Sequence, residues 1–386
     1  MTNGLSRPRK QFLDVLRVLA TCAVVLMHVL TGATDVTDAS RMPEYRGLLL
    51  AVMDLVTWCV PVFLLISGYL FLNPERELTY PVMLKKYCRR IALAILLFGV
   101  PYAGSELVVM ERTFRAGMIP EAVKMALTGN TWAHMWYLYL ILFLYLITPL
   151  LKKVLQVLPG WCVAVVMSVI FLGSSLAPFL NKVSGSTGIG SISIPVLPDS
   201  GVYFFYYLCG YLFVRKEVSV DKAGNRTEIS AEKNPAWNVW LVAAAVLAFG
   251  MVLSRTLSGF SVQMAYNYPF TVLLAVLIFA AAQRGWRRNT DSAAGEKNKK
   301  YRIPWQEAGA LSFAVYLVHP VYVNLFYKFV KFTPFTLLER CGVESIAAGH
   351  ALLIVFLLAF FLLVLALATA TAWILRKIPV LRKYVL

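Results

Sequence analysis

Long apolar runs with few charges recur along the chain and constrain its fold more than any other feature. A helix that crosses the hydrocarbon core of a bilayer needs about 20 apolar residues. Because 59% of the 386 residues are hydrophobic and only 15% are charged, a water-soluble domain could not bury so much apolar surface. The sequence therefore predicts an all-α integral membrane protein, a bundle of about ten transmembrane helices forming one domain over residues 1–386. The predicted spans are 11–32, 48–72, 90–110, 132–151, 159–180, 200–214, 236–254, 265–283, 308–327 and 347–375, of which the sixth is short.

The distribution of positive charge gives these spans a direction. With the N-terminus placed inside, 26 of the 37 Lys and Arg residues fall in cytoplasmic segments, 10 in outer loops and one, Arg17, within a span. Such asymmetry is typical of a multi-pass protein of the bacterial plasma (inner) membrane, here with both termini cytoplasmic. It also explains the net charge of +17, so membrane lipid is an expected partner and nucleic acid is not.

Polar segments separate the predicted spans. Residues 215–235 and 284–305 are basic and turn-rich, and we expect them to be cytoplasmic loops. Residues 182–200 are rich in Gly, Ser and Pro and predict an extracytoplasmic loop, whereas 117–131 predicts a short helix at the outer interface. The six cysteines include no C-x-x-C pair, so neither a zinc site nor a disulfide framework is expected, and no metal is predicted.

Ionisable residues inside a membrane are costly and are candidates for function. The first span contains Asp14, Arg17 and His28. At about 100° per residue, Arg17 and His28 face the same side of the helix, with His28 about 16 Å further toward the outer face. Asp14 lies on the same stripe, where it can pair with Arg17. A structural ion pair and a helix–helix polar contact would also explain these residues, but their alignment favours a functional site. Arginine can bind phosphate or polarise a carbonyl, and histidine can move protons.

Two further spans carry polar candidates. His134 and Trp136 open the fourth span, where an interfacial aromatic belt is the simpler explanation for either residue alone. His319 lies near mid-membrane in the ninth span beside Pro320, which frees a backbone carbonyl. His350 begins the last span and is expected at the interface.

A basic group precedes the third span, in the segment KKYCRR. Lys85, Lys86, Arg89 and Arg90 would surround the cytoplasmic mouth of the bundle below Arg17. Ordinary positive-inside charge explains them as well as recognition of a phosphate-rich cytoplasmic ligand does.

Four segments together resemble the membrane acyltransferase 3 family, whose members acylate bacterial surface glycans. They are the Arg-x10-His of Arg17 and His28, VPVFLLISGYLF in the second span, HMWYLYLILFLYLITPLL in the fourth and SFAVYLVHP in the ninth. They cover most of the chain in the expected order. The resemblance implies a ten-helix enzyme that takes an acyl group, commonly acetyl, from cytoplasmic acyl-coenzyme A and delivers it to a hydroxyl of an extracytoplasmic glycan or lipid-linked sugar.

The resemblance also implies roles for single residues. Arg17 and His28 match the essential pair of the family, and Arg89 and Arg90, beside Lys86, match basic residues that would hold the phosphates of coenzyme A. The remaining matches are Ser67 and Gly68 of the second-span SG, and Tyr316 and His319 of the ninth-span motif. Many relatives carry an additional hydrolase-like domain after the tenth span. This chain ends about ten residues beyond its last span, so we expect that contribution to be absent or supplied by a partner.

The mechanism expected from these assignments places the thioester near His28. His28 would act as general base for the acceptor hydroxyl, with a transient acyl-histidine as the other route. Arg17, held by Asp14, would position the donor or stabilise the oxyanion. The alternative function is a proton-coupled secondary transporter or flippase that uses Asp14, Arg17 and His28 as a relay, although no two related halves are visible. A membrane scaffold would leave the buried Arg and His unexplained. Acceptor identity, acyl length and homo-oligomerisation stay open.

Overall fold

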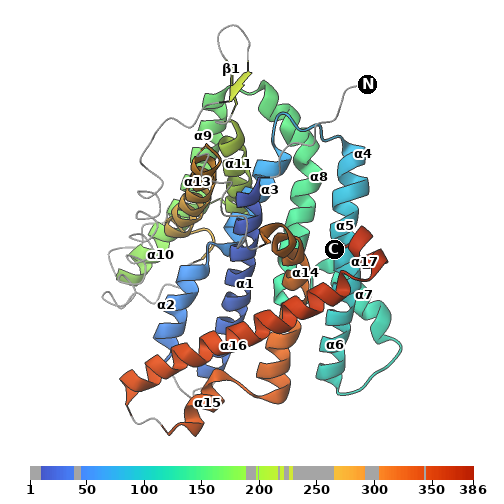
Figure 1. Cartoon of the computed structure of the whole chain (residues 1–386), viewed down its shortest axis with the longest axis vertical. Helices are drawn as coiled ribbons and strands as arrows, with labels where there is room; N and C mark the ends of the chain where they lie inside the picture. The colour runs from blue at the N-terminus through green and yellow to red at the C-terminus, as the bar shows by residue number, and fades with distance from the viewer. Residues whose placement is uncertain are drawn as a thin grey trace.

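The computed structural model describes residues 10–38, 45–187, 197–198, 200–215, 218–220, 226–228, 265–291, 304–342 and 345–386, and these residues form a bundle of helices (Figure 1). Helix α1 (Gln11–Asp38) runs through the middle of the bundle. It packs against the following helices: α2 (Arg46–Val56), α3 (Cys59–Phe71), α13 (Pro269–Asp291), α14 (Trp305–Asn324) and α16 (Ile346–Leu375). The polar groups of α1 therefore lie among neighbouring helices.

The predicted all-α membrane fold is confirmed. Eight helical stretches in the described part of the chain are long and apolar enough to cross a membrane, and they coincide with eight of the predicted spans: Gln11–Val36, Arg46–Phe71, Tyr80–Glu111, Ala133–Val157, Gly160–Lys182, Pro269–Trp286, Trp305–Val330 and Ile346–Leu375. The sixth predicted span forms α11 (Gly201–Arg215), whose 15 residues are fewer than a full crossing needs. The seventh, 236–254, lies outside the described residues.

Helices α3 and α11 cross at two glycines. A Cβ atom on Gly68 would lie 1.9 Å from the carbonyl oxygen of Tyr207, and one on Gly210 would lie 2.3 Å from that of Leu65. Small residues let two membrane helices approach until their backbones touch. Gly68 of the SG motif therefore has a packing role, which fixes the neighbouring Ser67 on α3.

The third span begins earlier than predicted. It starts at Tyr80 and runs through α4 (Tyr80–Val82), the π-helical turn η2 (Met83–Cys88), α5 (Arg89–Ala94), the π-helical turn η3 (Ile95–Gly99) and α6 (Val100–Glu111). Hydropathy predicted residue 90 as the first residue of the span, because the residues before it are basic and polar. In the structure these residues are nevertheless helical. The KKYCRR segment is thus held on a helix.

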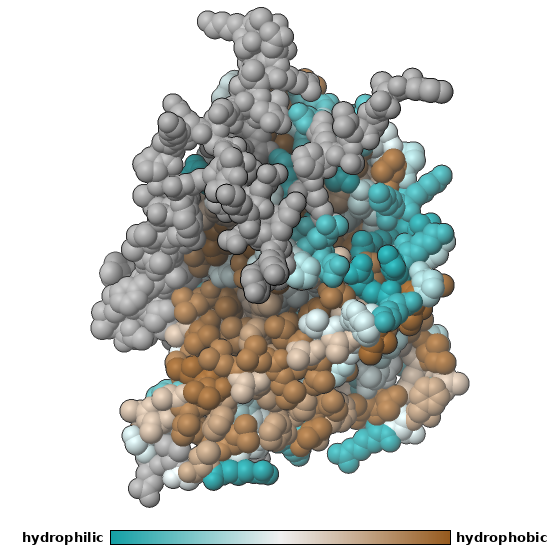
Figure 2. All heavy atoms as spheres, in the orientation of Figure 1, coloured by the Kyte–Doolittle hydropathy of each residue, from teal (hydrophilic) through white to brown (hydrophobic). Residues whose placement is uncertain are grey.

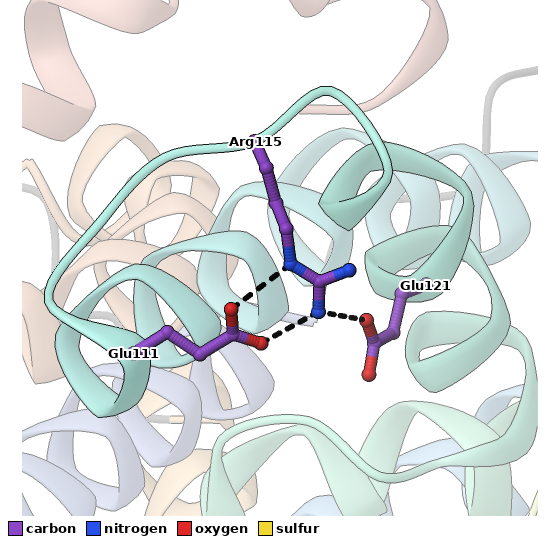
Figure 3. A network of polar contacts seen from close by, with 3 residues as sticks. All are labelled: Glu111, Arg115 and Glu121. Carbon is purple, nitrogen blue, oxygen red and sulfur yellow. Dashed lines mark hydrogen bonds and ion pairs between the residues drawn. The ribbon is translucent and has the colours of Figure 1, made fainter.

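The predicted short helix within 117–131 is present as α7 (Met118–Thr128). It packs back against α6 through a small cluster that includes Leu107 and Met118. The connection between them is closed by Arg115, whose guanidinium lies between Glu111 and Glu121 (Figure 3). The shortest nitrogen–oxygen distances are 2.7 Å to Glu111 and 3.5 Å to Glu121.

Three of the predicted loop segments contain regular secondary structure. After the 3-10 turn η4 (Ala133–Met135) come α8 (Trp136–Val157), α9 (Gly160–Phe171), the π-helical turn η5 (Leu172–Leu176) and α10 (Ala177–Thr187). Helix α10 continues into the segment 182–200, so this segment begins as a helix. The segment 215–235 contains a short antiparallel hairpin of β1 (Val218–Val220) and β2 (Arg226–Glu228). The segment 284–305 begins inside α13, which extends to Asp291.

The chain ends beside the beginning of α1. Helix α14 continues as the π-helical turn η8 (Leu325–Val330), followed by α15 (Pro334–Arg340), α16 and α17 (Pro379–Tyr384). Figure 2 shows apolar side chains along α16 and hydrophilic ones where α5 and α17 meet. Arg90 of α5 donates hydrogen bonds to the main-chain oxygens of Val385 and Leu386. Because Arg90 and Arg17 also line one cavity, the C-terminal segment and the beginning of α1 lie at one end of the bundle.

Candidate active site

Three arginines line a cavity of about 450 Å³ between α1, α3, α5, α8 and α14. We call it the arginine cavity, after Arg17, Arg76 and Arg90. The described residues that line it include no Asp or Glu side chain, and its apolar and aromatic walls come mainly from α3 and α8. Three guanidinium groups in an otherwise apolar space favour an anionic ligand with an apolar part.

Arg17 is held at this cavity by its own helix. Its guanidinium donates to the carboxylate of Asp14, with a nitrogen–oxygen distance of 2.9 Å. The side chain of Asp14 is 1% exposed and that of Arg17 is 28% exposed, so the pair is buried at the carboxylate and open at the guanidinium. Gly309 of α14 makes room for Asp14, because a Cβ atom at position 309 would lie 3.0 Å from its Cβ. The predicted pairing of Asp14 with Arg17 is confirmed.

The second arginine, Arg76, was not predicted as a site residue. Its guanidinium lies 5.1 Å from the ring centre of Phe71, and it donates to the hydroxyl of Tyr87. The backbone around it is fixed by Lys152, whose ammonium group donates to the main-chain oxygens of Asn73, at 2.7 Å, and of Arg76. Arg76 follows the second span within a polar turn. In the sequence its charge is indistinguishable from the ordinary positive charge of cytoplasmic loops, and this is why it was not predicted.

A more exposed basic cavity of about 400 Å³ adjoins the arginine cavity. We call it the basic cavity; it is lined by Lys85, Lys86, Arg89 and Arg90 together with Arg382 and Lys383 of α17. No carboxylate is among the described residues that line it. Arg90 lines both cavities and its guanidinium lies 5.3 Å from the ring centre of Phe313. The predicted basic residues are therefore together, and α17 adds two cations that the sequence did not single out for a site.

His28 and His134 line a second large cavity, of about 530 Å³, which we call the histidine cavity. A neighbouring cavity of about 670 Å³ shares both histidines and reaches Lys328 and Glu106. His319 lies behind them. The ring centres are 5.0 Å apart for His28 and His319, 6.3 Å for His28 and His134, and 5.8 Å for His134 and His319. Three of the four histidines of the chain, from α1, η4 and α14, thus meet at one place.

The hydrogen bonds of His319 define which of its nitrogens carries the proton. Its Nδ1 lies 2.8 Å from the main-chain oxygen of Tyr316 and 3.2 Å from that of Val315. A carbonyl oxygen only accepts, so Nδ1 is the donor, and in the neutral ring Nε2 keeps its lone pair. Pro320 is the reason that the oxygen of Tyr316 is available, because proline has no N–H to bond it in the helix. The Nε2 atoms of His319 and His134 are both buried, and neither has a hydrogen-bond partner among the described residues.

Aromatic residues hold α14 and η4 in register around the histidines. Tyr316 donates its hydroxyl to the main-chain oxygen of His134. Tyr102 donates to the main-chain oxygen of Leu317 at 2.6 Å, and its ring stacks on Trp132 at 4.3 Å. These contacts attach the loop that precedes α8 to helix α14, and this places His134 beside His319.

The predicted site residues occupy two cavities and not one. Arg17 and Ser67 line the arginine cavity, whereas His28, His134 and Trp136 line the histidine cavity. Trp136 packs its ring against Tyr203 at 5.2 Å, so it is part of the cavity wall and not only of an aromatic belt. Tyr316 lines both cavities, as does Tyr137, which the sequence did not single out.

The remaining polar residues near the span ends are His350 and the buried carboxylate of Asp54. His350 lies outside both cavities and packs against Tyr45 at 5.0 Å. Among the described residues, no group of three His, Cys, Asp or Glu side chains is arranged so that it could hold a metal ion, and this includes the three clustered histidines. Asp54 is fully buried and lines the histidine cavity.

The sequence matches a known family over nearly the whole chain. The family model described as an acyltransferase domain, that of the acyltransferase 3 family, matches residues 10–376. Neither a curated protein nor a solved structure matches the chain significantly. The match includes every described helix from α1 to α16 and the whole described lining of the histidine cavity, whereas Arg382 and Lys383 of the basic cavity and Leu386 of the arginine cavity lie beyond it. The chain therefore belongs to the acyltransferase 3 family and is a multi-pass membrane acyltransferase.

Proposed function

We propose that this protein transfers an acetyl group from cytoplasmic acetyl-coenzyme A to a hydroxyl of an extracytoplasmic glycan or lipid-linked sugar. One observation carries the proposal: an arginine-lined and a histidine-lined cavity lie at successive levels along α1 and meet between α8 and α14. Each suits one substrate of the transfer. The positive-inside distribution of charge assigns the arginine cavity to the cytoplasmic side of the bundle.

The positive charge of the cavities supports the proposed binding of acyl-coenzyme A as the donor. Coenzyme A is a polyanion with a long, weakly polar arm that ends in the thioester. Its phosphates suit the basic cavity, which is lined by Lys86, Arg89 and Lys383 among other cations. Its arm suits the arginine cavity, whose walls are largely apolar and aromatic. Arg90 stands between the two and is bound by the main-chain oxygens of Val385 and Leu386, so a phosphate that binds there replaces a contact of the C-terminal segment.

The acceptor side is supported by the histidines. The hydroxyl oxygen attacks the thioester carbonyl carbon, the carbon–sulfur bond breaks, and an ester and coenzyme A result. The hydroxyl proton passes to His28 and from there to the departing thiolate. A general base of this kind contributes about 10²–10⁴ in rate. Arg17 orients the donor and stabilises the charge that develops on the carbonyl oxygen. His134 and His319 supply unprotonated ring nitrogens beside His28.

Acyl transfer in the native membrane tests the proposal. Inverted vesicles are prepared from cells that carry the intact gene, a deletion or the His28→Ala variant, and labelled acetyl-coenzyme A is added at the exposed cytoplasmic face. Label enters a vesicle-bound glycan or lipid only with the intact gene, and His28→Ala loses at least 99% of it. His350→Ala is the matched control, because His350 lies outside the cavities. Full activity of His28→Ala contradicts the mechanism, whereas proton-coupled flux without acyl transfer favours a transporter or flippase.

A further inference from the structure

The arginine cavity and the histidine cavity are separated by two tyrosine rings. Among the described residues, Tyr137 of α8 and Tyr316 of α14 are common to the linings of both cavities. Their ring centres are 5.9 Å apart and the rings are inclined at 70°. The cavities hold about 450 Å³ and 530 Å³, so each is large enough for a substantial ligand. The narrow place is the junction between them.

Tyr316 is the fixed side of this junction. Its side chain is buried, its hydroxyl donates to the main-chain oxygen of His134, and its ring stacks on Phe313 at 6.4 Å. Tyr137 is less buried than Tyr316; its hydroxyl hydrogen-bonds with the side chain of Ser67, and its ring packs at an angle against Phe63, with ring centres 6.2 Å apart. A group that passes from one cavity to the other therefore displaces the ring of Tyr137 against a wall formed by Tyr316.

The proposed transfer requires such a passage. The donor lies on the Arg17 side and the base His28 lies on the other, about 16 Å further along α1. The thioester can meet His28 only if the acyl group enters the junction. There, each side of the acyl chain contacts one of the two tyrosine rings. Each additional methylene then has to be accommodated between two rings. In binding sites of this kind one methylene changes specificity by about 10- to 200-fold.

We propose that Tyr137 and Tyr316 are specificity-determining residues that restrict the transferred group to a short acyl chain of acetyl size. This inference rests on the proposed function and adds to it the residues that select the donor: with both tyrosines in place, acetyl is accepted and butyryl or longer acyl groups are rejected. The selection takes place at the junction, because neither cavity is itself small.

Competition between two donors tests the selection. The same inverted vesicles receive acetyl- and butyryl-coenzyme A together, and the ratio of the two esters formed is measured by mass spectrometry. The intact protein favours acetyl at least tenfold. Tyr137→Ala, which opens the junction, lowers this ratio at least tenfold by gaining butyryl transfer, whereas Tyr137→Phe keeps the ring and the ratio. Because the readout is a ratio, partial loss of folded protein does not change it.

Tyr145→Ala is the matched control. It removes the same side chain from the same helix two turns away and enlarges only the arginine cavity, so its acetyl-to-butyryl ratio stays within twofold of the intact protein. Should Tyr137→Ala not fold, Tyr137→Leu carries the same expected change. Equal transfer of both groups by the intact protein, or an unchanged ratio in the opened variants, overturns the selection while the proposed function stands. No transfer from either donor by the intact protein overturns both.

Discussion

The imidazole ring of His28 lies 5.0 Å from that of His319, centre to centre, although the two residues are in α1 and α14. His319 is fixed from behind, since its Nδ1 donates to the oxygen of Tyr316 that Pro320 leaves free. Its Nε2 therefore carries a lone pair on the buried side of the histidine group. His319 thus has two functions that substitution can separate: it satisfies a carbonyl, and it offers an acceptor.

Substitution of His319 separates these functions. Asn places an amide near Nδ1 and keeps the bond to Tyr316, whereas Gln places an amide oxygen near Nε2 and can act as acceptor there. We expect His319→Asn to keep a wild-type melting temperature but to reduce acetyl transfer at least tenfold, and His319→Gln to retain more activity than His319→Asn. Thermal unfolding and initial rates in vesicles measure the two effects. If the His319→Asn variant keeps full acetyl-transfer activity, the role of His319 is only to donate a hydrogen bond to the carbonyl of Tyr316.

Much of this site could be predicted because its geometry is local. Asp14 and Arg17 are three residues apart on one helix, so their pairing follows from helical periodicity. The apolar runs likewise identified eight of the spans. The meeting of His28, His134 and His319 depends on how α1, η4 and α14 pack, and no spacing in the sequence encodes that. The helical start at Tyr80 was missed for another reason: hydropathy does not distinguish a basic helical turn from a loop.

Arg17 tests the need for a guanidinium group. Arg17→Lys keeps the charge next to Asp14 but replaces the planar fork by a single ammonium group. We expect kcat/KM for acetyl-coenzyme A to fall at least tenfold, which corresponds to about 1.4 kcal/mol of lost transition-state stabilisation. Asp14→Asn should act through the same group and should lower kcat/KM without a further loss when combined with Arg17→Lys. Full activity of Arg17→Lys would show that a positive charge is sufficient.

The basic cavity predicts how the donor is recognised. The double variant R382A/K383A removes two cations that α17 contributes and should raise KM for acetyl-coenzyme A several-fold with little change in kcat. Because the effect is electrostatic, it should shrink as salt is raised. S-acetylpantetheine, which has no phosphate, should be used equally well by the variant and the intact protein.

A charge-matched control accompanies this measurement. R115A/K124A removes two cations from the α6–α7 segment, which does not line the basic cavity, and should leave KM unchanged. Equal increases in KM for acetyl-coenzyme A and S-acetylpantetheine in R382A/K383A would be inconsistent with phosphate recognition by α17.

Gly68 tests whether the SG motif serves packing or chemistry. A methyl group at this position would lie 1.9 Å from the carbonyl oxygen of Tyr207, which belongs to the backbone of α11 and cannot rotate away. Overpacking of this kind costs about 1–3 kcal/mol or more. We therefore expect Gly68→Ala to lower the melting temperature of the detergent-purified protein by several degrees and to shift it toward aggregates in size-exclusion chromatography. Gly47→Ala is the control, since a Cβ atom there has no neighbour within 4 Å in the described part of the chain and alanine is the better helix former. A stable Gly68→Ala protein that has lost acyl transfer would instead place Gly68 in the chemistry of the arginine cavity.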